Sequence, residues 1–292
     1  KIALVTPAKN EMENLPELVS CIESQTIPIH LWICINDSSD DQTGDYLEKQ
    51  AKQLKNCRTM QVFHPKFDEQ SYALGPKYST VVSYGFQRVL EYEKATGEVM
   101  DYIGILDADC FVETDYYRKI IGRFTMLPRL GIGSGVIYYR SENGLEFDKM
   151  PLRWARGAIR VWRSACFREA GYRVGYSADG ISSALAWTRG WESQSFKDVR
   201  AESRKMGARV KPDYYGATAY YRYNPHYYIF LKSLLMRLRS GSEEARVYYK
   251  GYLEAKKTKK RIPLDTREIR YFKMLLLRNV IEIGRASCRE RV

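Results

Sequence analysis

Short apolar runs that alternate with helical segments are the feature of the first 110 residues that most constrains the fold. Apolar runs of strand length lie at 2–5, 31–35, 59–63 and 103–106, and segments with apolar residues at helical spacing lie between them. Strands that alternate with helices are typical of a parallel sheet covered by helices on both faces. We therefore predict an α/β fold with a doubly wound, mostly parallel sheet, which binds its ligand outside the carboxyl ends of the strands.

Polar clusters follow three of these predicted strands. Residues 6–11 (Thr-Pro-Ala-Lys-Asn-Glu) follow the first, 36–41 (Asn-Asp-Ser-Ser-Asp-Asp) follow the second, and 107–109 (Asp-Ala-Asp) follow the fourth. Because the carboxyl ends of parallel strands share one edge of a sheet, we expect the three clusters to meet in one crevice.

Asp107 and Asp109 end a buried strand and are separated by one residue. In an extended chain such side chains point to the same side, roughly 6–7 Å apart, where two carboxylates repel each other. A divalent cation offsets this repulsion, and Mg²⁺ and Mn²⁺ prefer oxygen ligands and often bind together with substrate phosphates. The alternative interpretation is a solvated turn, in which aspartate is common.

Length, cysteine pattern and hydropathy narrow the class of protein. A chain of 292 residues is long enough for one large domain with an extension. No run reaches the roughly 18–20 apolar residues that span a bilayer. The six cysteines are scattered and form no C-x-x-C pair, which argues against a zinc cluster and favours a reducing compartment. We therefore predict a cytoplasmic protein, with the inner face of the membrane as an alternative location.

The positive charge of the chain is concentrated in one segment. Residues 231–280 contain 14 basic and 5 acidic residues, a net charge of +9, whereas residues 1–230 carry only +2. A near-neutral domain with an acidic crevice argues against a nucleic-acid-binding protein, although the total charge of +12 and the 23 tyrosines suggest that alternative.

The second half of the chain is less regular. We expect strands at 132–139 and 208–210, and helices at 166–172, 181–188, 202–206 and from residue 226 onward. These patterns suggest a domain at 1–225, divided into halves at 1–110 and 111–225, and a basic helical extension at 226–281. The last residues, 282–292, look like a translated sequencing adapter and are excluded from the fold prediction.

Four segments together resemble the family 2 glycosyltransferases. They are 6–11, 36–41, the Asp-x-Asp of 107–109, and 157–171 with Asp179 after it, in the order of that family. The resemblance covers roughly residues 1–225. It implies a GT-A type, Rossmann-like fold and an inverting enzyme that uses a nucleotide-sugar donor and Mn²⁺ or Mg²⁺.

The chain departs from this family at two points. Ala178-Asp179 replaces the usual Glu-Asp pair of the catalytic base, so that assignment rests on one carboxylate. The Gln-x-x-Arg-Trp segment is absent, and Arg237-Leu238-Arg239 lies in about its place, which argues against processive polysaccharide synthesis.

The resemblance implies roles for the residues at the strand ends. Asp109 is the expected metal ligand, and Asp107 is expected to contact the metal, a metal-bound water or the donor ribose. The other nucleotide-binding candidates are Thr6, Pro7, Asn10, Glu11, Asp37 and Lys77, where Asp37 would accept from the nucleobase and Lys77, at a helix start, would bind phosphate. The alternatives are acidic residues that favour a helix N-terminus for Glu11 and Asp37, and a surface lysine for Lys77.

Asp179 is the candidate general base that takes the proton of the acceptor hydroxyl. Its alternative role is the N-cap of the helix that follows. Glu192 and Asp148 are the other candidates for the base.

Arginines alternate with tryptophans around residue 160. Arg156, Arg160 and Trp162 are candidates to contact the acceptor or a phosphate, because guanidinium groups bind phosphate and aromatic faces stack on sugars. The alternative is an amphipathic strand whose arginines face water.

The basic tail permits three interpretations. The predicted helix 227–239 places Ile229, Phe230, Leu234 and Leu238 near one side, which would suit an anionic membrane surface close to a lipid-linked acceptor. The tail could instead close over the donor, with Arg237 or Arg239 on the diphosphate, or it could be a solvated helical extension.

The sequence therefore predicts a metal-assisted transferase that moves a sugar from a nucleotide-diphosphate donor to a hydroxyl of a glycan or lipid-linked acceptor. A sugar-phosphate nucleotidyltransferase is the alternative enzyme. That class has a glycine-rich loop after its first strand, and residues 6–14 contain no glycine.

Overall fold

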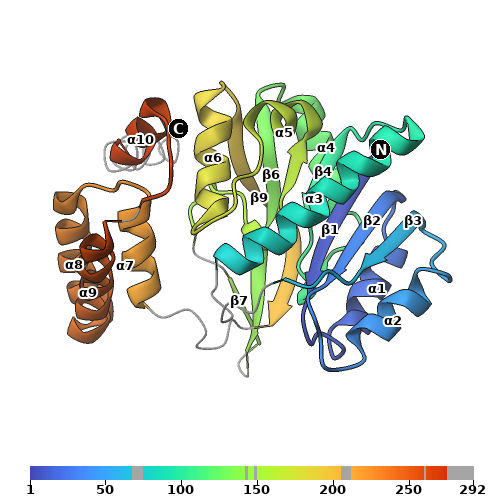
Figure 1. The fold of residues 1–292 in the computed structure, drawn as a ribbon, viewed down its shortest axis with the longest axis horizontal. Helices are drawn as coiled ribbons and strands as arrows, with labels where there is room; N and C mark the ends of the chain where they lie inside the picture. Colours follow the sequence, from blue (N-terminus) through green and yellow to red (C-terminus); the bar gives the residue numbers. More distant parts are fainter. Residues whose placement is uncertain (68–74, 142–143, 148–149, 205–211, 260, 275–292) are drawn as a thin grey trace. The chain divides into compact units, whose positions relative to one another are not determined.

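The computed structural model divides the chain into two compact units, Lys1–Met206 and Gly207–Val292 (Figure 1). It describes all residues except 68–74, 142–143, 148–149, 205–211, 260 and 275–292. The first unit contains a nine-stranded sheet with its helices, and the described part of the second unit is helical.

The first unit contains the strands β1 (Ile2–Ala8), β2 (Ile29–Asn36), β3 (Cys57–Phe63), β4 (Tyr102–Ile105), β5 (Cys110–Val112), β6 (Leu130–Ser141), β7 (Gly144–Phe147), β8 (Val161–Arg163) and β9 (Glu192–Arg204). Its helices are α1 (Leu15–Glu23), α2 (Thr43–Gln50), α3 (Pro76–Thr96), α4 (Tyr116–Met126), α5 (Ser164–Ala170) and α6 (Ala178–Thr188), with a 3₁₀ turn at Gly157–Ile159. The second unit contains α7 (Pro212–Tyr221), α8 (His226–Ser240), α9 (Ser242–Thr258) and α10 (Thr266–Lys273).

The sheet has the order β3-β2-β1-β4-β8-β6-β9-β5, with β7 paired to β6. Strands β1 to β4 run parallel, as the alternation of strands and helices predicts. Beyond β4 the sheet is mixed, because β8 runs antiparallel to both β4 and β6, and β5 runs antiparallel to β9. The predicted α/β fold is confirmed. Each antiparallel pair of strands includes at least one strand from residue 130 onward.

Helices cover both faces of the parallel half of the sheet. On one face, α1, α2 and α4 pack on a core that includes Leu4 and Trp32. On the other face α3 lies so close that a methyl group on Gly85 would be 2.3 Å from Val5 Cγ1. Because neighbouring residues of a strand point to opposite faces, the continuous apolar runs of β1 and β2 serve both layers.

The helix predicted at 202–206 is wrong for residues 202–204, which belong to β9, and residues 205–206 lie outside the described residues. Glu202 pairs with Tyr138 of β6 and with Phe111 of β5, so it lies inside the sheet. Glutamate and arginine favour a helix locally, but ladder bonds to strands on both sides outweigh this weak preference. The strand predicted at 208–210 lies outside the described residues.

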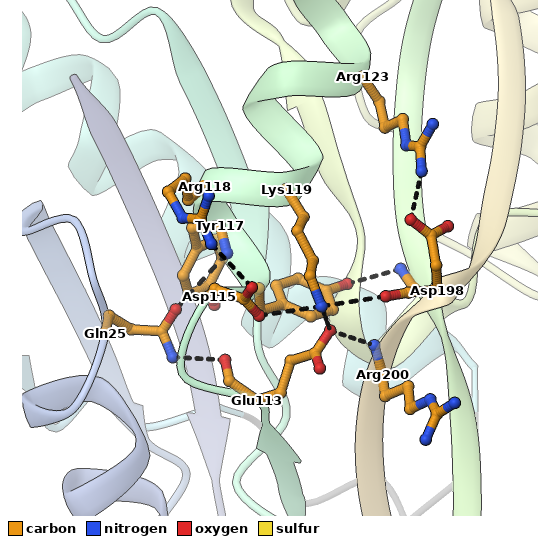
Figure 2. A network of polar contacts seen from close by, with 11 residues as sticks. Gln25, Glu113, Asp115, Tyr117, Arg118, Lys119, Arg123, Asp198 and Arg200 are labelled. Carbon is orange, nitrogen blue, oxygen red and sulfur yellow. Dashed lines mark hydrogen bonds and ion pairs between the residues drawn. The ribbon is translucent and has the colours of Figure 1, made fainter.

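A polar network holds β5 and α4 against β9 (Figure 2). Lys119 Nζ donates to Glu113 Oε1 at 2.9 Å and to the Asp198 carbonyl at 3.1 Å, and the Arg200 amide donates to the same Glu113 oxygen at 2.8 Å. Gln25 Nε2 donates to the Glu113 carbonyl at 2.9 Å, which ties in the loop after α1. Because β5 begins directly after Asp109, this network fixes the chain on one side of the Asp-x-Asp segment.

The second unit begins earlier than the predicted boundary at residue 226. Helix α7 packs with α8 and α9 around Tyr220, Ile229, Tyr248 and Tyr252. It therefore belongs to the helical unit rather than to the sheet domain. Among the described residues of the chain, no helix is both long and apolar enough to cross a bilayer.

Replacing Gly216 with alanine is expected to destabilise the second unit by about 2 kcal/mol or more, because the added methyl group would overpack a helix crossing. That methyl would lie 1.9 Å from the Tyr248 carbonyl oxygen, which belongs to backbone and moves only with the helix. Urea unfolding followed by circular dichroism measures the change. Gly122→Ala on α4 is the matched control, since nothing lies within 4 Å of its added methyl. Equal stability of the two variants would contradict this close packing of α7 on α9.

Candidate active site

The carboxyl ends of β2, β1 and β4 lie next to one another, because these strands are parallel neighbours (Figure 1). Backbone bonds continue the pairing past the strand ends: the Asp37 amide donates to the Ala8 carbonyl at 2.8 Å, and the Leu106 amide donates to the Val5 carbonyl at 3.0 Å. The three predicted polar clusters are therefore at one edge of the sheet.

The loops after β1 and β2 are bonded to each other. The Asn10 amide donates to Ser39 Oγ at 3.0 Å, and Asn10 Oδ1 accepts from the Asp40 amide at 2.8 Å. The Glu11 amide donates to Thr43 Oγ1 at 2.8 Å. These bonds hold the two loops together, and one of them occupies Asn10 Oδ1.

The other predicted residues in β1 and in the loop after it differ in burial and in their hydrogen bonds. Thr6 is fully buried, and its hydroxyl accepts from Trp32 Nε1 at 2.8 Å, so its side chain joins β1 to β2 inside the core. Pro7 is half-buried at the end of the strand. Glu11 is also half-buried and accepts a bond of 2.5 Å from Asn14 Nδ2.

Asp37 and Lys77 form an ion pair at the end of β2. Lys77 Nζ lies 3.1 Å from Asp37 Oδ2, and both side chains are largely buried. Asp37 Oδ1 is buried and has no hydrogen-bond partner among the residues that the structure describes. A buried acceptor without a donor costs free energy, so this oxygen is suited to an N–H group of a ligand.

Asp107 and Asp109 are half-buried side by side after β4. Burial is the largest cause that raises the pKa of Asp107 well above its usual value, and the charge of Asp109 is the second. A hydrogen bond from Tyr78 lowers this pKa, whereas the charges of Asp179 and Glu11 raise it further. Tyr78 Oη donates to Asp107 Oδ1 at 2.5 Å. Three other carboxylates, those of Asp109, Asp179 and Glu11, therefore lie near enough to affect the pKa of Asp107.

Asp179 is the second residue of α6, and its side chain is exposed. The helix begins at Ala178 with Ser177 at the N-cap position, so the alternative role of Asp179 as N-cap is wrong. Its backbone carbonyl accepts from Arg160 Nη1 at 3.1 Å. Its carboxylate lies against Gly157, where an added methyl group would be 2.7 Å from Asp179 Oδ2.

A tyrosine lies beside this carboxylate. Burial is the largest cause that raises the pKa of Tyr172, and the charge of Asp179 follows it. The charge of Asp107 raises this pKa as well. The ring of Tyr172 packs 5.1 Å from that of Phe86 on α3. Tyr172 thus places its hydroxyl near both Asp107 and Asp179.

The first turn of α3 contacts three parts of the site. Lys77 pairs with Asp37 and Tyr78 bonds to Asp107, as described above. Ser79 Oγ accepts from the Gly175 amide at 2.9 Å and donates to the Gly175 carbonyl at 3.2 Å, which holds the segment before Asp179. The positive end of the helix dipole also faces this acidic edge.

Tyr78, Ser79 and Tyr172 were not among the site residues predicted from the sequence. The Gly75-Pro76 pair marks the helix start and therefore the surroundings of Tyr78 and Ser79. No local pattern indicates their partners, which lie 29 and 96 residues away in the chain.

The structure contradicts the prediction that Arg156, Arg160 and Trp162 contact the acceptor or a phosphate, because all three side chains are buried. Trp162 is fully buried, and both arginines are 2% exposed. Arg156 Nη1 donates to the Trp154 carbonyl at 2.8 Å, and Arg160 Nη2 donates to the Ala155 carbonyl at 2.7 Å. These guanidinium groups bind backbone carbonyls because a buried charge needs hydrogen-bond partners.

The other candidates lie elsewhere. Glu192 begins β9, which runs parallel to β6, and it pairs there with Arg129 at 3.5 Å. Since β6 has the same direction as β4, Glu192 is at the opposite edge of the sheet from Asp107, and it is excluded as the base. Arg237 is exposed on α8 of the second unit. Asp148 and the side chain of Arg239 lie outside the described residues.

Sequence comparison finds no protein-family model and no curated protein that matches the chain. Comparison with solved structures does find matches. Residues 1–349 of Staphylococcus aureus TarS in complex with UDP-GlcNAc align with a TM-score of 0.54 at 12% identity, over 88% of this chain and 73% of TarS.

Two further structures align with similar scores. The mannosyltransferase PcManGT from Pyrobaculum calidifontis, in complex with GDP-Man and Mn²⁺, aligns with a TM-score of 0.58 at 13% identity, over 97% of this chain and 80% of that protein. GalNAc-T7 with UDP, GalNAc and Mn²⁺ aligns with a TM-score of 0.55 at 13% identity, over 87% and 56% of the two chains. At this identity the likeness concerns the fold, and the chain has the fold of the GT-A glycosyltransferases.

Proposed function

We propose that this chain is an inverting glycosyltransferase of the family 2 type, which transfers a sugar from a nucleoside-diphosphate donor to an acceptor hydroxyl. The observation that carries the proposal is the arrangement of Asp37, Asp107, Asp109 and Asp179 around the first turn of α3. These carboxylates come from three segments, namely the residues after β2, the residues after β4 and the start of α6, and each segment suits a different part of the donor or acceptor.

The nucleotide would bind at the ends of β1 and β2. Asp37 Oδ1, buried and without a donor, would accept an N–H of the nucleobase. Lys77 is held beside it by the ion pair and would reach the diphosphate, toward which the N-terminus of α3 also contributes a positive potential. Pro7 and Glu11 would line this part of the site.

The residues after β4 fit a hard divalent cation. Asp107 and Asp109 supply carboxylate oxygens, the donor type that Mg²⁺ and Mn²⁺ prefer, and their mutual repulsion falls when a cation binds. No group of three His, Cys, Asp or Glu side chains in the described part of the chain could hold a metal by itself. Phosphate oxygens of the donor would supply the remaining ligands, and the bound ion would stabilise the negative charge of the departing diphosphate.

Asp179 would act as the general base. As the acceptor oxygen bonds to the anomeric carbon, the bond from that carbon to the diphosphate breaks, and the hydroxyl proton passes to the Asp179 carboxylate. A single displacement of this kind inverts the anomeric configuration. The exposed carboxylate on α6 leaves its outer side open to an acceptor.

The solved structures with this fold support the donor class. TarS is described with UDP-GlcNAc and PcManGT with GDP-Man and Mn²⁺, so nucleotide sugars and a divalent metal occur with this fold. We extend the proposal to a glycan or lipid-linked acceptor, and to a cytoplasmic protein that contacts a membrane peripherally.

A donor screen tests the proposal. The melting temperature of the chain is measured with UDP, GDP, dTDP and CDP sugars, each with and without Mn²⁺. We expect one nucleotide class to raise it by several degrees only when Mn²⁺ is present. The selected donor is then tested for transfer, with the anomeric configuration of the product read by proton NMR. No metal-dependent shift with any donor, or a product of retained configuration, would contradict the proposal.

Tyr78→Phe is expected to weaken the binding of Mn²⁺ to the nucleotide-bound protein about 10- to 100-fold, as the loss of a residue that orients a metal-site carboxylate commonly does. The substitution removes only the hydroxyl that bonds to Asp107 at 2.5 Å. Titration of the Mn²⁺ electron paramagnetic resonance signal measures the affinity. Tyr92→Phe, on the same helix and bonded to Glu98 at 3.4 Å, is the matched control and should bind Mn²⁺ normally. Equal affinities in the two variants would exclude a positioning role for Tyr78.

Gly157→Ala is expected to lower the turnover number about tenfold or more with little change in stability, since a small displacement of a catalytic group has effects of this order. The added methyl would meet the end of the Asp179 side chain at 2.7 Å, and that side chain is free to move aside. Steady-state kinetics and thermal unfolding measure the two effects. An unchanged turnover number would show that the position of Asp179 against Gly157 does not matter for the reaction.

A further inference from the structure

Helix α8 has apolar side chains on two opposite faces. Ile229 is fully buried and packs with Tyr220, Tyr248 and Tyr252 of α7 and α9, and Met236 lies against the same cluster. This inner face accounts for the position of α8 within the three-helix group. It does not account for the apolar residues on the outer face.

The outer face forms a continuous apolar stripe. Six side chains along it are between 43% and 77% exposed, namely Tyr227, Phe230, Leu231, Leu234, Leu235 and Leu238. Their spacing of three and four residues places them on one side of the helix over three turns. Single exposed apolar residues are ordinary on protein surfaces, but an ordered stripe marks an interaction surface.

The charges of the helix restrict what can cover this stripe. Helix α8 contains Lys232, Arg237 and Arg239 and no Asp or Glu. At 100° per residue, Arg237 lies along one border of the stripe. Lys232 lies near the other border, where its Nζ is 4.9 Å from the centre of the Tyr248 ring. The segment 231–280 to which the helix belongs has a net charge of +9. The covering surface must therefore be apolar within and anionic at its border.

We propose that the outer face of α8 binds the surface of a membrane that contains anionic phospholipids. The six apolar side chains would enter the boundary between headgroups and acyl chains, and the basic side chains would lie among the lipid phosphates. A second copy of the chain fits less well, because a two-fold contact through this face would bring together two helices that each contain basic residues and no Asp or Glu. This inference concerns the second unit and does not depend on the proposed transfer reaction.

Cosedimentation of the full chain with sucrose-loaded vesicles tests the proposal. Vesicles contain either phosphatidylcholine alone or phosphatidylcholine with 30% phosphatidylglycerol. We expect the chain to bind the anionic vesicles at least tenfold more strongly than the neutral ones. It should lose most of this difference in 0.5 M NaCl, because the charge of Arg237 at the border of the stripe is exposed.

Variants distinguish the stripe from general charge attraction. Leu235→Ser with Leu238→Ser removes two side chains that are more than half exposed, and it should weaken binding to anionic vesicles at least tenfold without loss of fold. Arg237→Gln should weaken it about fivefold. The matched control is Met126→Ser with Leu127→Ser, two exposed apolar residues at the end of α4 in the other unit, which should bind as the unchanged chain does.

Two results would overturn the inference. One is vesicle binding by the Leu235 and Leu238 double variant that equals that of the control. The other is a chain that does not bind anionic vesicles but forms a dimer by light scattering that the double variant lacks, which would identify the stripe as a contact between copies.

Discussion

Asp109→Ala is expected to remove the Mn²⁺-dependent part of nucleoside-diphosphate binding and to lower the rate of sugar transfer about 100- to 1,000-fold, the usual cost of losing stabilisation of a developing negative charge. Asp109 lies between β4 and β5 and directly precedes β5, and the network around Glu113 and Lys119 fixes β5 (Figure 2). The backbone that carries Asp109 is therefore held between the two strands, and Asp107, the other carboxylate of the segment, already accepts a bond from Tyr78.

Calorimetric titration of the nucleoside diphosphate, with and without Mn²⁺, measures this effect. Asp45→Ala, which removes an exposed carboxylate from α2, is the control for the loss of one negative charge. An Asp109→Ala variant that keeps its Mn²⁺-dependent affinity would mean that the ion binds elsewhere.

Asp179→Asn is expected to lower the turnover number about 100- to 10,000-fold while the affinities for donor and Mn²⁺ stay unchanged, because a general base contributes this much and does not hold the donor. The amide keeps the size of the side chain, so its contact with Gly157 and the bond from Arg160 to the Asp179 carbonyl should persist. The expected loss is thus confined to the proton transfer.

Initial rates over a range of donor concentrations separate the two parameters. A fall in the turnover number at constant KM for the donor supports the base assignment. A variant that keeps near-normal turnover would remove Asp179 from the mechanism, and a variant that loses donor affinity would place it in the donor site instead.

The first half of the fold was predictable because its signals are local. Each of β1 to β4 is a short apolar run bounded by polar or turn residues, and the helices between them show apolar residues at helical spacing. The structure of the second half depends on pairing between strands that lie far apart in the sequence. Residues 202–204 have the composition of a helix, yet they form part of β9 because β6 and β5 lie on its two sides.

The residues of the candidate site were likewise predictable where the signal is local and unpredictable where it depends on distant contacts. Asp37, Asp107 and Asp109 were found because strand ends in a parallel sheet have a known common edge. Tyr78 was missed because a tyrosine in a helix gives no sign of its partner. The roles of Arg160 and Trp162 were predicted wrongly. A sequence that alternates arginine with tryptophan has the same pattern whether the arginines bind a ligand or bind buried backbone carbonyls.

The helical tail shows a similar limit of pattern analysis. Helix α8 was predicted to within one residue at each end, but Ile229 was grouped with Phe230, Leu234 and Leu238 on one side. In the structure Ile229 lies in the core, and the other three lie on the outer stripe. Periodicity identifies an apolar helix, whereas the neighbouring helices determine which apolar face is buried.

A crystal structure of the chain with Mn²⁺ and the nucleoside diphosphate selected by the donor screen is the most direct test of a single donor site at the ends of β1, β2 and β4. We expect the nucleobase beside Asp37, the ion on Asp109, and the diphosphate between them near the first turn of α3. Density that places the base and the ion in separate hollows, or an ion bound away from Asp109, would contradict this account.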